Sequence, residues 1–213
     1  MMKVMILGAA GQIGRMVTQN LLKQTDDDLV LYGRNVTSRL SNLKSSRVTL
    51  VDGTFQEVAT IKANLTDVDA VYLSFVANDD VIGPLVKTLA AAGIKRFIAA
   101  NIPDLYQEVS GNFQSWYREH TGIIWQTPYK KAADIIESSQ LDYIILRITW
   151  LYNQEGNTAV HVTKKGEPFT EAQVTRQAVA QFVTDLLTGQ ADYHRESLGL
   201  GEPGTDFEKP SFY

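Results

Sequence analysis

The feature that most constrains this chain is a glycine pattern directly after its first apolar segment. The residues from Lys3 to Leu7 form a short apolar run of the kind found in buried strands. The sequence GAAGQIG follows, and its glycines are spaced three apart, at Gly8, Gly11 and Gly14. The next apolar residues recur every fourth position, which predicts a helix with one buried stripe formed by Ile13, Val17 and Leu21. A strand, a tight glycine turn and a helix are therefore expected in immediate succession.

Each glycine has a physical role in such a unit. Gly8 permits the sharp turn out of the strand, Gly11 lets the backbone approach a ligand without an intervening side chain, and Gly14 allows the helix to pack closely on the sheet. The unpaired N–H groups at the helix start then form a site for a diphosphate, which predicts a bound dinucleotide. The alternative is that three glycines only make a tight turn.

The rest of the chain alternates short apolar runs with helical patterns. Six strands are predicted, at residues 3–7, 29–32, 47–51, 70–75, 96–100 and 143–147. Helical spacing is clearest at Val81, Leu85 and Leu89, and again after Thr175, a predicted helix cap. This alternation predicts an α/β protein of the Rossmann type, a doubly wound parallel sheet of six or more strands with helices on both faces.

We expect one dinucleotide-binding domain over residues 1–213, in which residues 151–213 add a small substrate-side region and a tail. Residues 103–127 and 151–171 lack a clear period and are expected to flank a pocket; the second stretch contains a short possible strand at 159–163. Residues 199–213 contain several glycines and prolines and are expected to form a surface tail or a mobile end.

The end of the second strand predicts which dinucleotide is bound. No Asp or Glu follows Tyr32 to accept the ribose hydroxyls, whereas Arg34 can pair with a 2′-phosphate. NADP(H) is therefore expected in preference to NAD(H). Arg15 and Arg39 can add charge at the same phosphate, although all three arginines can equally be solvated.

A turn follows the third strand at Asp52 and Gly53. The Asp52 carboxylate either accepts a hydrogen bond from the adenine amino group or only helps to form the turn.

Composition excludes several other classes. With 20 basic and 24 acidic residues the net charge is −4, so the chain lacks the overall positive charge typical of nucleic-acid binding. There is no cysteine, and the histidines His120, His161 and His194 lack metal-ligand spacing, so no metal is expected. The first apolar run is too short for a membrane span. A cytoplasmic protein, a monomer or a homodimer, with a small-molecule acceptor as its partner is therefore expected.

Several of these segments together resemble the atypical short-chain dehydrogenases/reductases of the NmrA-like, NAD(P)H-binding type. They are GAAGQIG, YGR after the second strand, AVYLSF, GIKRFI and KAADIIESSQLDYIILR. The resemblance implies strand order 3-2-1-4-5-6 and a cofactor across the carboxyl edge of the sheet. It further implies the following positions along the cofactor: Gly8, Gln12 and Ile13 at the diphosphate, Arg34 at the 2′-phosphate, Asp52 near adenine, Ser74 and Phe75 toward the nicotinamide, and Lys131 at its ribose.

The chain departs from that family in its catalytic residues. The wider family places a Tyr four residues before a Lys, but Thr127 holds that position before Lys131. Tyr129 is the nearest replacement acid, or a residue that only packs at a helix start. Asn101 stands near the usual Ser or Thr and is expected to orient a substrate carbonyl or a water.

Four aromatic residues in the stretch 103–127 either stack on a flat acceptor or pack the stretch down: Tyr106, Trp116, Tyr117 and Trp125.

These features predict an NADPH-dependent oxidoreductase, a reductase without the standard Tyr-x-x-x-Lys pair, that transfers hydride to a quinone, a flavin or a carbonyl. The alternative is a non-catalytic NADP(H)-binding redox sensor or regulatory protein, which the missing pair favours.

Overall fold

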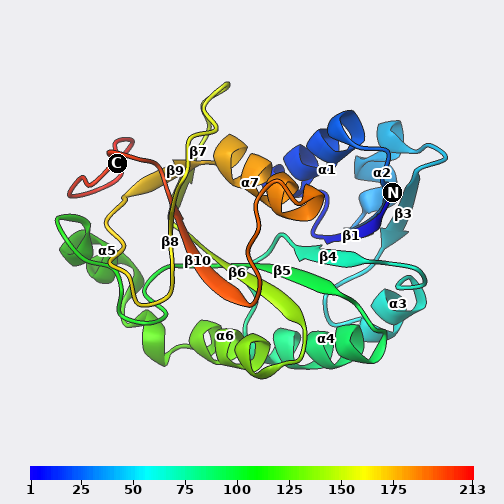
Figure 1. Cartoon of the computed structure of the whole chain (residues 1–213), viewed down its shortest axis with the longest axis horizontal. Helices are drawn as coiled ribbons and strands as arrows, with labels where there is room; N and C mark the ends of the chain where they lie inside the picture. The colour runs from blue at the N-terminus through cyan, green and yellow to red at the C-terminus, as the bar shows by residue number, and fades with distance from the viewer.

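The computed structural model describes residues 1–213 and is built on one eight-stranded sheet with the order β3-β2-β1-β4-β5-β6-β10-β8 (Figure 1). Seven strands are parallel, and only β8 runs antiparallel, against β10. The strands are β1 Lys3–Leu7, β2 Asp28–Gly33, β3 Val48–Asp52, β4 Ala70–Leu73, β5 Arg96–Asn101, β6 Asp142–Ile148, β8 His161–Thr163 and β10 Glu196–Gly201. The predicted Rossmann class and the order 3-2-1-4-5-6 are confirmed.

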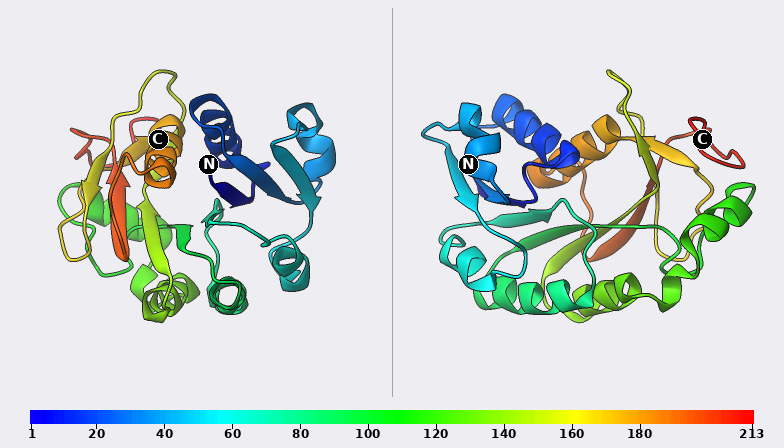
Figure 2. Two further views of the ribbon diagram at one scale, coloured as in Figure 1. Left: turned by 45° about the vertical axis from the view of Figure 1, so that its right-hand side comes forward. Right: turned by 180° about the vertical axis from the view of Figure 1, so that it is seen from behind.

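Helices cover both faces of the sheet, as Figure 2 shows. One face carries α1 Gln12–Gln24, α2 Val36–Arg39 and α7 Arg176–Thr188. The other carries α3 Val58–Ala63, α4 Asp79–Ala91, α5 Phe113–Thr121 and α6 Pro128–Ser138. Two short 3₁₀ turns, η1 Ser41–Leu43 and η2 Ile124–Gln126, and a two-stranded parallel sheet of β7 Trp150–Tyr152 and β9 Gln173–Thr175 complete the chain.

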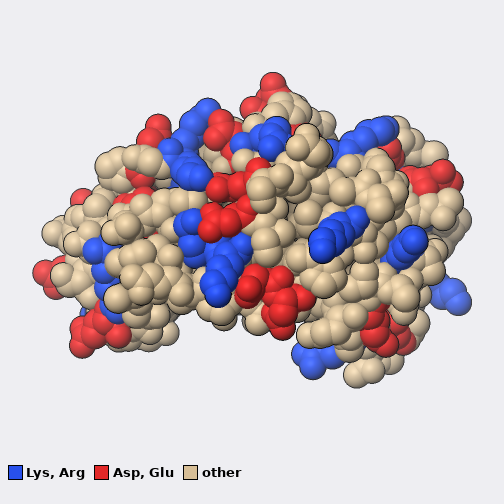
Figure 3. Space-filling model, turned by 90° about the horizontal axis from the view of Figure 1, so that it is seen from below, with Lys and Arg blue, Asp and Glu red and all other residues tan.

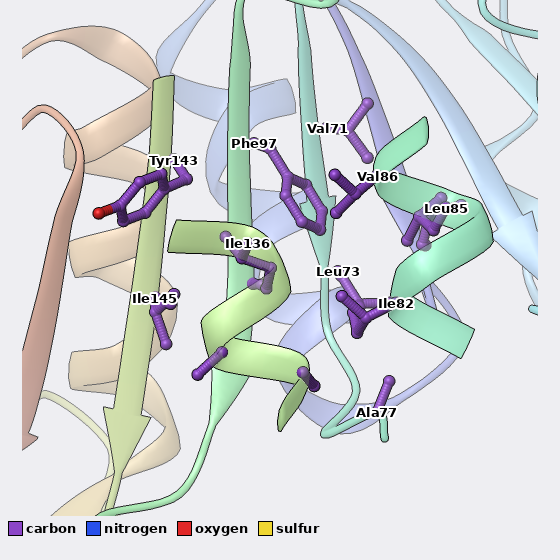
Figure 4. Close-up of a cluster of buried hydrophobic side chains, with 14 of the residues drawn as sticks. Val71, Leu73, Ala77, Ile82, Leu85, Val86, Phe97, Ile136, Tyr143 and Ile145 are labelled. Atoms are coloured by element: carbon purple, nitrogen blue, oxygen red, sulfur yellow. The ribbon is translucent and has the colours of Figure 1, made fainter. Parts of the chain in front are cut away.

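The alternation of side chains along the strands divides the buried residues into two cores. On β4, for example, Val71 and Leu73 pack toward α4 and α6, while Ala70 and Tyr72 lie on the α1 and α7 face. Figure 4 shows the first core, where Phe97 of β5 lies between the two helices. The central strands are covered on both faces, which explains why they are continuous apolar runs in the sequence.

The segment after residue 151 contributes more to the sheet than a tail. Residues 199–201 belong to β10, which pairs with β6, and the expectation of a glycine-rich surface tail is wrong for them. A Cβ at Gly199 would lie 2.3 Å from the Thr163 hydroxyl, and one at Gly201 would lie 2.2 Å from the Glu171 Cβ. These glycines let the segment containing β8 cross the strand closely, and they do not mark a flexible end.

The stretch 103–127, which showed no period, contains helix α5 and is held by two ion pairs. Arg118 Nε lies 2.8 Å from the fully buried Asp104 carboxylate, and Arg147 Nη1 of β6 lies 2.5 Å from Glu108 Oε1. Arg147 has no exposed surface and also donates to the Thr163 carbonyl. Buried charges anchor this stretch in place of a continuous apolar stripe, so its periodicity is weak.

The helical face formed by α4 and α6 carries basic and acidic side chains interspersed, with no large area of one sign (Figure 3). No helix of the structure combines the length and the apolar character needed to cross a bilayer.

Candidate functional site

The glycine turn has the geometry that the sequence predicts. Gly8 adopts a φ of +86°, a left-handed conformation that favours glycine. A Cβ at Gly14 would lie 2.6 Å from the Gly8 carbonyl oxygen and 3.0 Å from the Ala9 Cα, so only glycine lets α1 start this close to the strand. The N–H groups of Gln12 and Ile13 have no acceptor in the chain. These two N–H groups lie in the first turn of a 13-residue helix, at the positive end of its dipole, an arrangement that suits a diphosphate.

A cavity of about 410 Å³ opens beside this turn. Its lining residues include Gly8, Gly11 and Gly33 together with Arg34 and Arg39. Arg39 Nη2 donates to the Ala10 carbonyl at 2.8 Å, while the exposed Arg34 guanidinium forms no ion pair or hydrogen bond within the chain. The cavity thus combines the glycine turn that precedes α1 with two guanidinium groups, which suits a ligand with several phosphates.

Gly53 lines the same cavity, and packing against Tyr32 requires glycine at this position. A Cβ at this position would lie 2.1 Å from the hydroxyl of Tyr32, which is fully buried and donates to the Thr54 carbonyl at 2.8 Å. Glycine therefore lets the turn after β3 lie directly on the end of β2.

Asp52 is exposed and is held by Thr37 at the start of α2. Its Oδ1 accepts from the Thr37 N–H at 2.9 Å, and its Oδ2 accepts from the Thr37 hydroxyl. The hydrogen bonds from the Thr37 hydroxyl and backbone hold the pKa of this carboxyl below its usual value. Asp52 does not line the cavity and is bonded within the turn, and its contact with adenine stays a prediction.

A second cavity, of about 370 Å³, lies where β4, β5 and β6 end. Ten of its 15 lining residues are hydrophobic, and none is charged. Its polar side chains are Asn101, Ser74, Thr121 and Thr149, and Tyr72, Tyr117 and Trp150 each add one polar group on an aromatic ring. In open α/β sheets ligands bind at this carboxyl edge, and an uncharged lining suits an uncharged, apolar molecule.

Ser74 and Phe75 line both cavities and form their common wall. Both residues were expected within the fourth strand, but β4 ends at Leu73, so they lie in the loop that follows it. The Phe75 ring is 48% exposed and stacks on Phe55 with ring centroids 5.1 Å apart. A dinucleotide extended along the carboxyl edge would pass this wall, which is where the family resemblance predicts Ser74 and Phe75 to lie.

Among the candidate catalytic residues, only Asn101 lines the apolar cavity. Its Oδ1 accepts from the Ile102 N–H at 2.9 Å, and its Nδ2 lies 3.4 Å from the Tyr129 carbonyl. Tyr129 is half-buried against the core, and Lys131 is exposed with no hydrogen bond from its side chain. The structure does not bring Tyr129 and Lys131 into either cavity.

Three of the four aromatic residues of the stretch 103–127 pack the stretch down. The Trp116 ring stacks on Phe113 and His120, Trp125 lies beneath the Arg118 guanidinium, and Tyr106 donates to Glu137. The fourth, Tyr117, lines the apolar cavity while its hydroxyl donates to the Pro103 carbonyl at 2.8 Å. Burial raises the pKa of Tyr117 well above its usual range.

Several cavity residues could not be found from the sequence. Trp150 and Leu151 come from β7. Ile13, which was expected at the diphosphate, lines the apolar cavity from α1. Tyr72 lies inside an apolar strand, and nothing in the sequence distinguishes it from the other aromatic core residues. Arg39, interpreted from the sequence as either a phosphate contact or a solvated residue, lines the phosphate-side cavity.

None of the three histidines lines either cavity. Each is hydrogen-bonded within the protein, His120 to the Trp116 carbonyl, His161 to Glu171, and His194 to Asp142 and Asp192. No group of three or more His, Asp or Glu side chains is arranged to hold a metal ion.

Comparison with known proteins identifies the family. Residues 8–190 match the model of a family described as NAD(P)H-binding. A short-chain dehydrogenase/reductase (wide type) from Veillonella parvula, solved in complex with NADP, is 34% identical with a TM-score of 0.91, covering 99% of each chain. A Rossmann-fold NAD(P)-binding family protein from Shigella flexneri is 28% identical with a TM-score of 0.79, covering 100% of each chain.

A curated relative, the oxidoreductase nsrR of Aspergillus novofumigatus, is 33% identical over 82 residues, which are 37% of this chain and 31% of that protein. The full-length matches and the glycine-turn geometry agree with the resemblance drawn from the sequence. The chain therefore belongs to the NAD(P)H-binding family of atypical short-chain dehydrogenases/reductases.

Proposed function

We propose that this NAD(P)H-binding oxidoreductase uses NADPH to reduce a small, flat, uncharged acceptor such as a quinone or a flavin ring. The observation that carries the proposal is the pair of adjoining cavities, one lined by the glycine turn and two arginines, the other apolar and without a charged residue. When bound, NADPH supplies the hydride. The protein's own groups hold the phosphates and orient the acceptor.

The preference for NADPH rests on Arg34 and Arg39. A 2′-phosphate near the end of β2 would meet both guanidinium groups in the cavity, and no carboxylate lines that cavity to bind ribose hydroxyls instead. The NADP complex of the V. parvula relative supports the same preference.

The acceptor class rests on the apolar cavity. Its volume of about 370 Å³ suits a bicyclic or tricyclic ring, and its lining offers no side chain that ionises near neutral pH. Acceptors that need little acid assistance fit this lining better than simple carbonyls, because Tyr129 and Lys131 lie outside it. Holding the acceptor against the wall formed by Ser74 and Phe75 would accelerate the reaction mainly through proximity.

The test compares the two dinucleotides. Arg34→Ala should weaken NADPH binding about 10- to 100-fold, since a charge-assisted hydrogen bond contributes about 1.5–3 kcal/mol, and should leave NADH binding within about twofold. Lys23→Ala, at an exposed position late in α1, is the control and should change neither affinity. Equal losses for both dinucleotides would contradict the preference.

Turnover distinguishes the enzyme from a sensor, an alternative that the positions of Tyr129 and Lys131 outside the cavity favour. Oxidation of NADPH is followed at its absorbance band with a panel of quinones, flavins and carbonyls. Multiple turnovers with a quinone or a flavin support the proposal. Tight NADPH binding without turnover on any acceptor favours the sensor.

A further inference from the structure

Tyr72 carries a buried hydroxyl that the protein leaves without a partner. Its side chain has no exposed surface, lines the apolar cavity, and its hydroxyl makes no hydrogen bond within the chain. The two other tyrosines without exposed surface differ, because Tyr32 donates to the Thr54 carbonyl and Tyr117 to the Pro103 carbonyl. A buried tyrosine hydroxyl usually has a partner, and leaving one unpaired costs about 1–3 kcal/mol. Only a rearranged neighbour or a molecule in the cavity can satisfy it.

The neighbouring group that can accept a hydrogen bond from the Tyr72 hydroxyl is the hydroxyl of Ser74. Ser74 lies two residues further along the chain, on the wall shared by both cavities, and its hydroxyl makes no hydrogen bond within the chain. Its backbone is fixed, because its N–H donates to the Leu7 carbonyl at 2.9 Å. Tyr72 and Ser74 line the same cavity two residues apart, and the Ser74 hydroxyl lowers the pKa of Tyr72. The two hydroxyls are not aligned as a hydrogen bond in the structure.

We propose that Tyr72 and Ser74 form a two-hydroxyl donor chain in which Ser74 donates to a carbonyl oxygen of the molecule in the cavity and Tyr72 donates to the Ser74 Oγ. This assignment rests on the proposed function, and it makes Tyr72 a positioning residue that acts through Ser74. A hydroxyl has one donor and two acceptor positions, so Ser74 can accept from Tyr72 and donate outward at once. Each bond polarises the next and strengthens it.

The two hydroxyls of this donor chain donate hydrogen bonds and do not transfer a proton. Burial raises the pKa of Tyr72 to about 12, and no Lys, Arg or His lines the cavity to lower it. The phenol therefore stays neutral throughout the physiological range. Binding that depends on Tyr72 should accordingly be independent of pH between 6 and 9.

The carbonyl oxygen has two possible sources with the same chemistry, the nicotinamide carboxamide and the acceptor. NADPH binding, measured by fluorescence, reports the first, and the KM for menadione at saturating NADPH reports the second. Ser74→Ala should weaken one of these about 5- to 10-fold, and Ser74→Thr, which keeps the hydroxyl, should restore it to within about twofold of the native chain. A loss of 5- to 10-fold corresponds to about 0.9–1.4 kcal/mol, which lies within the range of a neutral hydrogen bond.

Tyr72→Phe should weaken the same step about two- to fivefold, and it should have no further effect in the Ser74→Ala background. The melting temperature without ligand should stay equal or rise, because the variant removes an unpaired hydroxyl. Tyr106→Phe is the matched control. Tyr106 lies outside both cavities and its hydroxyl donates to Glu137 at 2.7 Å, so this variant should lower the melting temperature and leave both binding measurements unchanged.

The outcomes separate this inference from the proposed function. Unchanged NADPH affinity and unchanged menadione KM in Tyr72→Phe, or fully additive effects of the two substitutions, would overturn the donor chain while NADPH oxidation stands. Coupled losses in NADPH affinity without turnover on any acceptor would support the chain and overturn the oxidoreductase.

Discussion

Replacing Gly14 by alanine tests the physical basis of the cofactor site. The added Cβ would lie 2.6 Å from the Gly8 carbonyl oxygen, whereas ordinary contact begins at 3.4 Å, so helix and turn must separate by about 0.8 Å. All three of its nearest atoms belong to the backbone of Gly8 and Ala9, and no flexible side chain can move away instead.

The cost has two parts. Overpacking of this kind costs about 1–3 kcal/mol, and the better helix propensity of alanine returns up to about 1 kcal/mol. A net loss of about 1–2 kcal/mol corresponds to a fall in melting temperature of about 3–6 °C for a chain of this length. The larger effect is on binding, because the displaced amides of Gln12 and Ile13 would no longer converge on a diphosphate. A loss of about 10- to 100-fold in NADPH affinity is expected.

Gly93→Ala is the matched control. Gly93 has a φ of +72° and open space around it, so alanine there costs about 1–2 kcal/mol through backbone strain alone. Calorimetric titration with NADPH and thermal unfolding without it are measured for both variants. Similar stability losses with binding lost only in Gly14→Ala support the reasoning. Native NADPH affinity in a folded Gly14→Ala protein would refute the assignment of this turn to the diphosphate.

Two further predictions concern stability. Arg147→Met leaves the buried Glu108 carboxylate without its cation. It should lower the free energy of unfolding, measured in urea, by about 3–5 kcal/mol. A loss below about 1 kcal/mol would contradict the argument that the unpaired buried charge is costly. The hydrogen bond to Asp142, assisted by Asp192 and opposed by Arg96, raises the pKa of His194 above its ordinary 6.5. The stabilisation that protonated His194 contributes is therefore full below pH 6.5 and is lost as the pH rises through the folded-state pKa. His194→Gln should accordingly reduce the free energy of unfolding more at pH 6 than at pH 8.5. An equal loss at both pH values would refute the raised pKa of His194.

Much of the fold follows from local patterns. The six parallel strands, the helix after Thr175 and the glycine turn were predicted within a few residues, because buried parallel strands and amphipathic helices impose their periods on the sequence. The position of Arg34 at the phosphate-side cavity follows from the same strand order. The assignments of Tyr129 and Lys131 to catalysis came from a family pattern, and they stay predictions, since neither residue lines the cavities.

The sequence by itself determined the Rossmann core, because the spacing of apolar residues and glycines acts over a few neighbours along the chain. Only the tertiary structure decided that residues 196–201 form a sheet strand, since Gly199 and Gly201 are required by segments that cross them from 30 or more residues away. It also decided the apolar cavity, whose wall joins β4, β5, α5 and β7. A buried hydroxyl such as that of Tyr72 has no sequence signature, because whether it has a partner depends on atoms that only folding brings together.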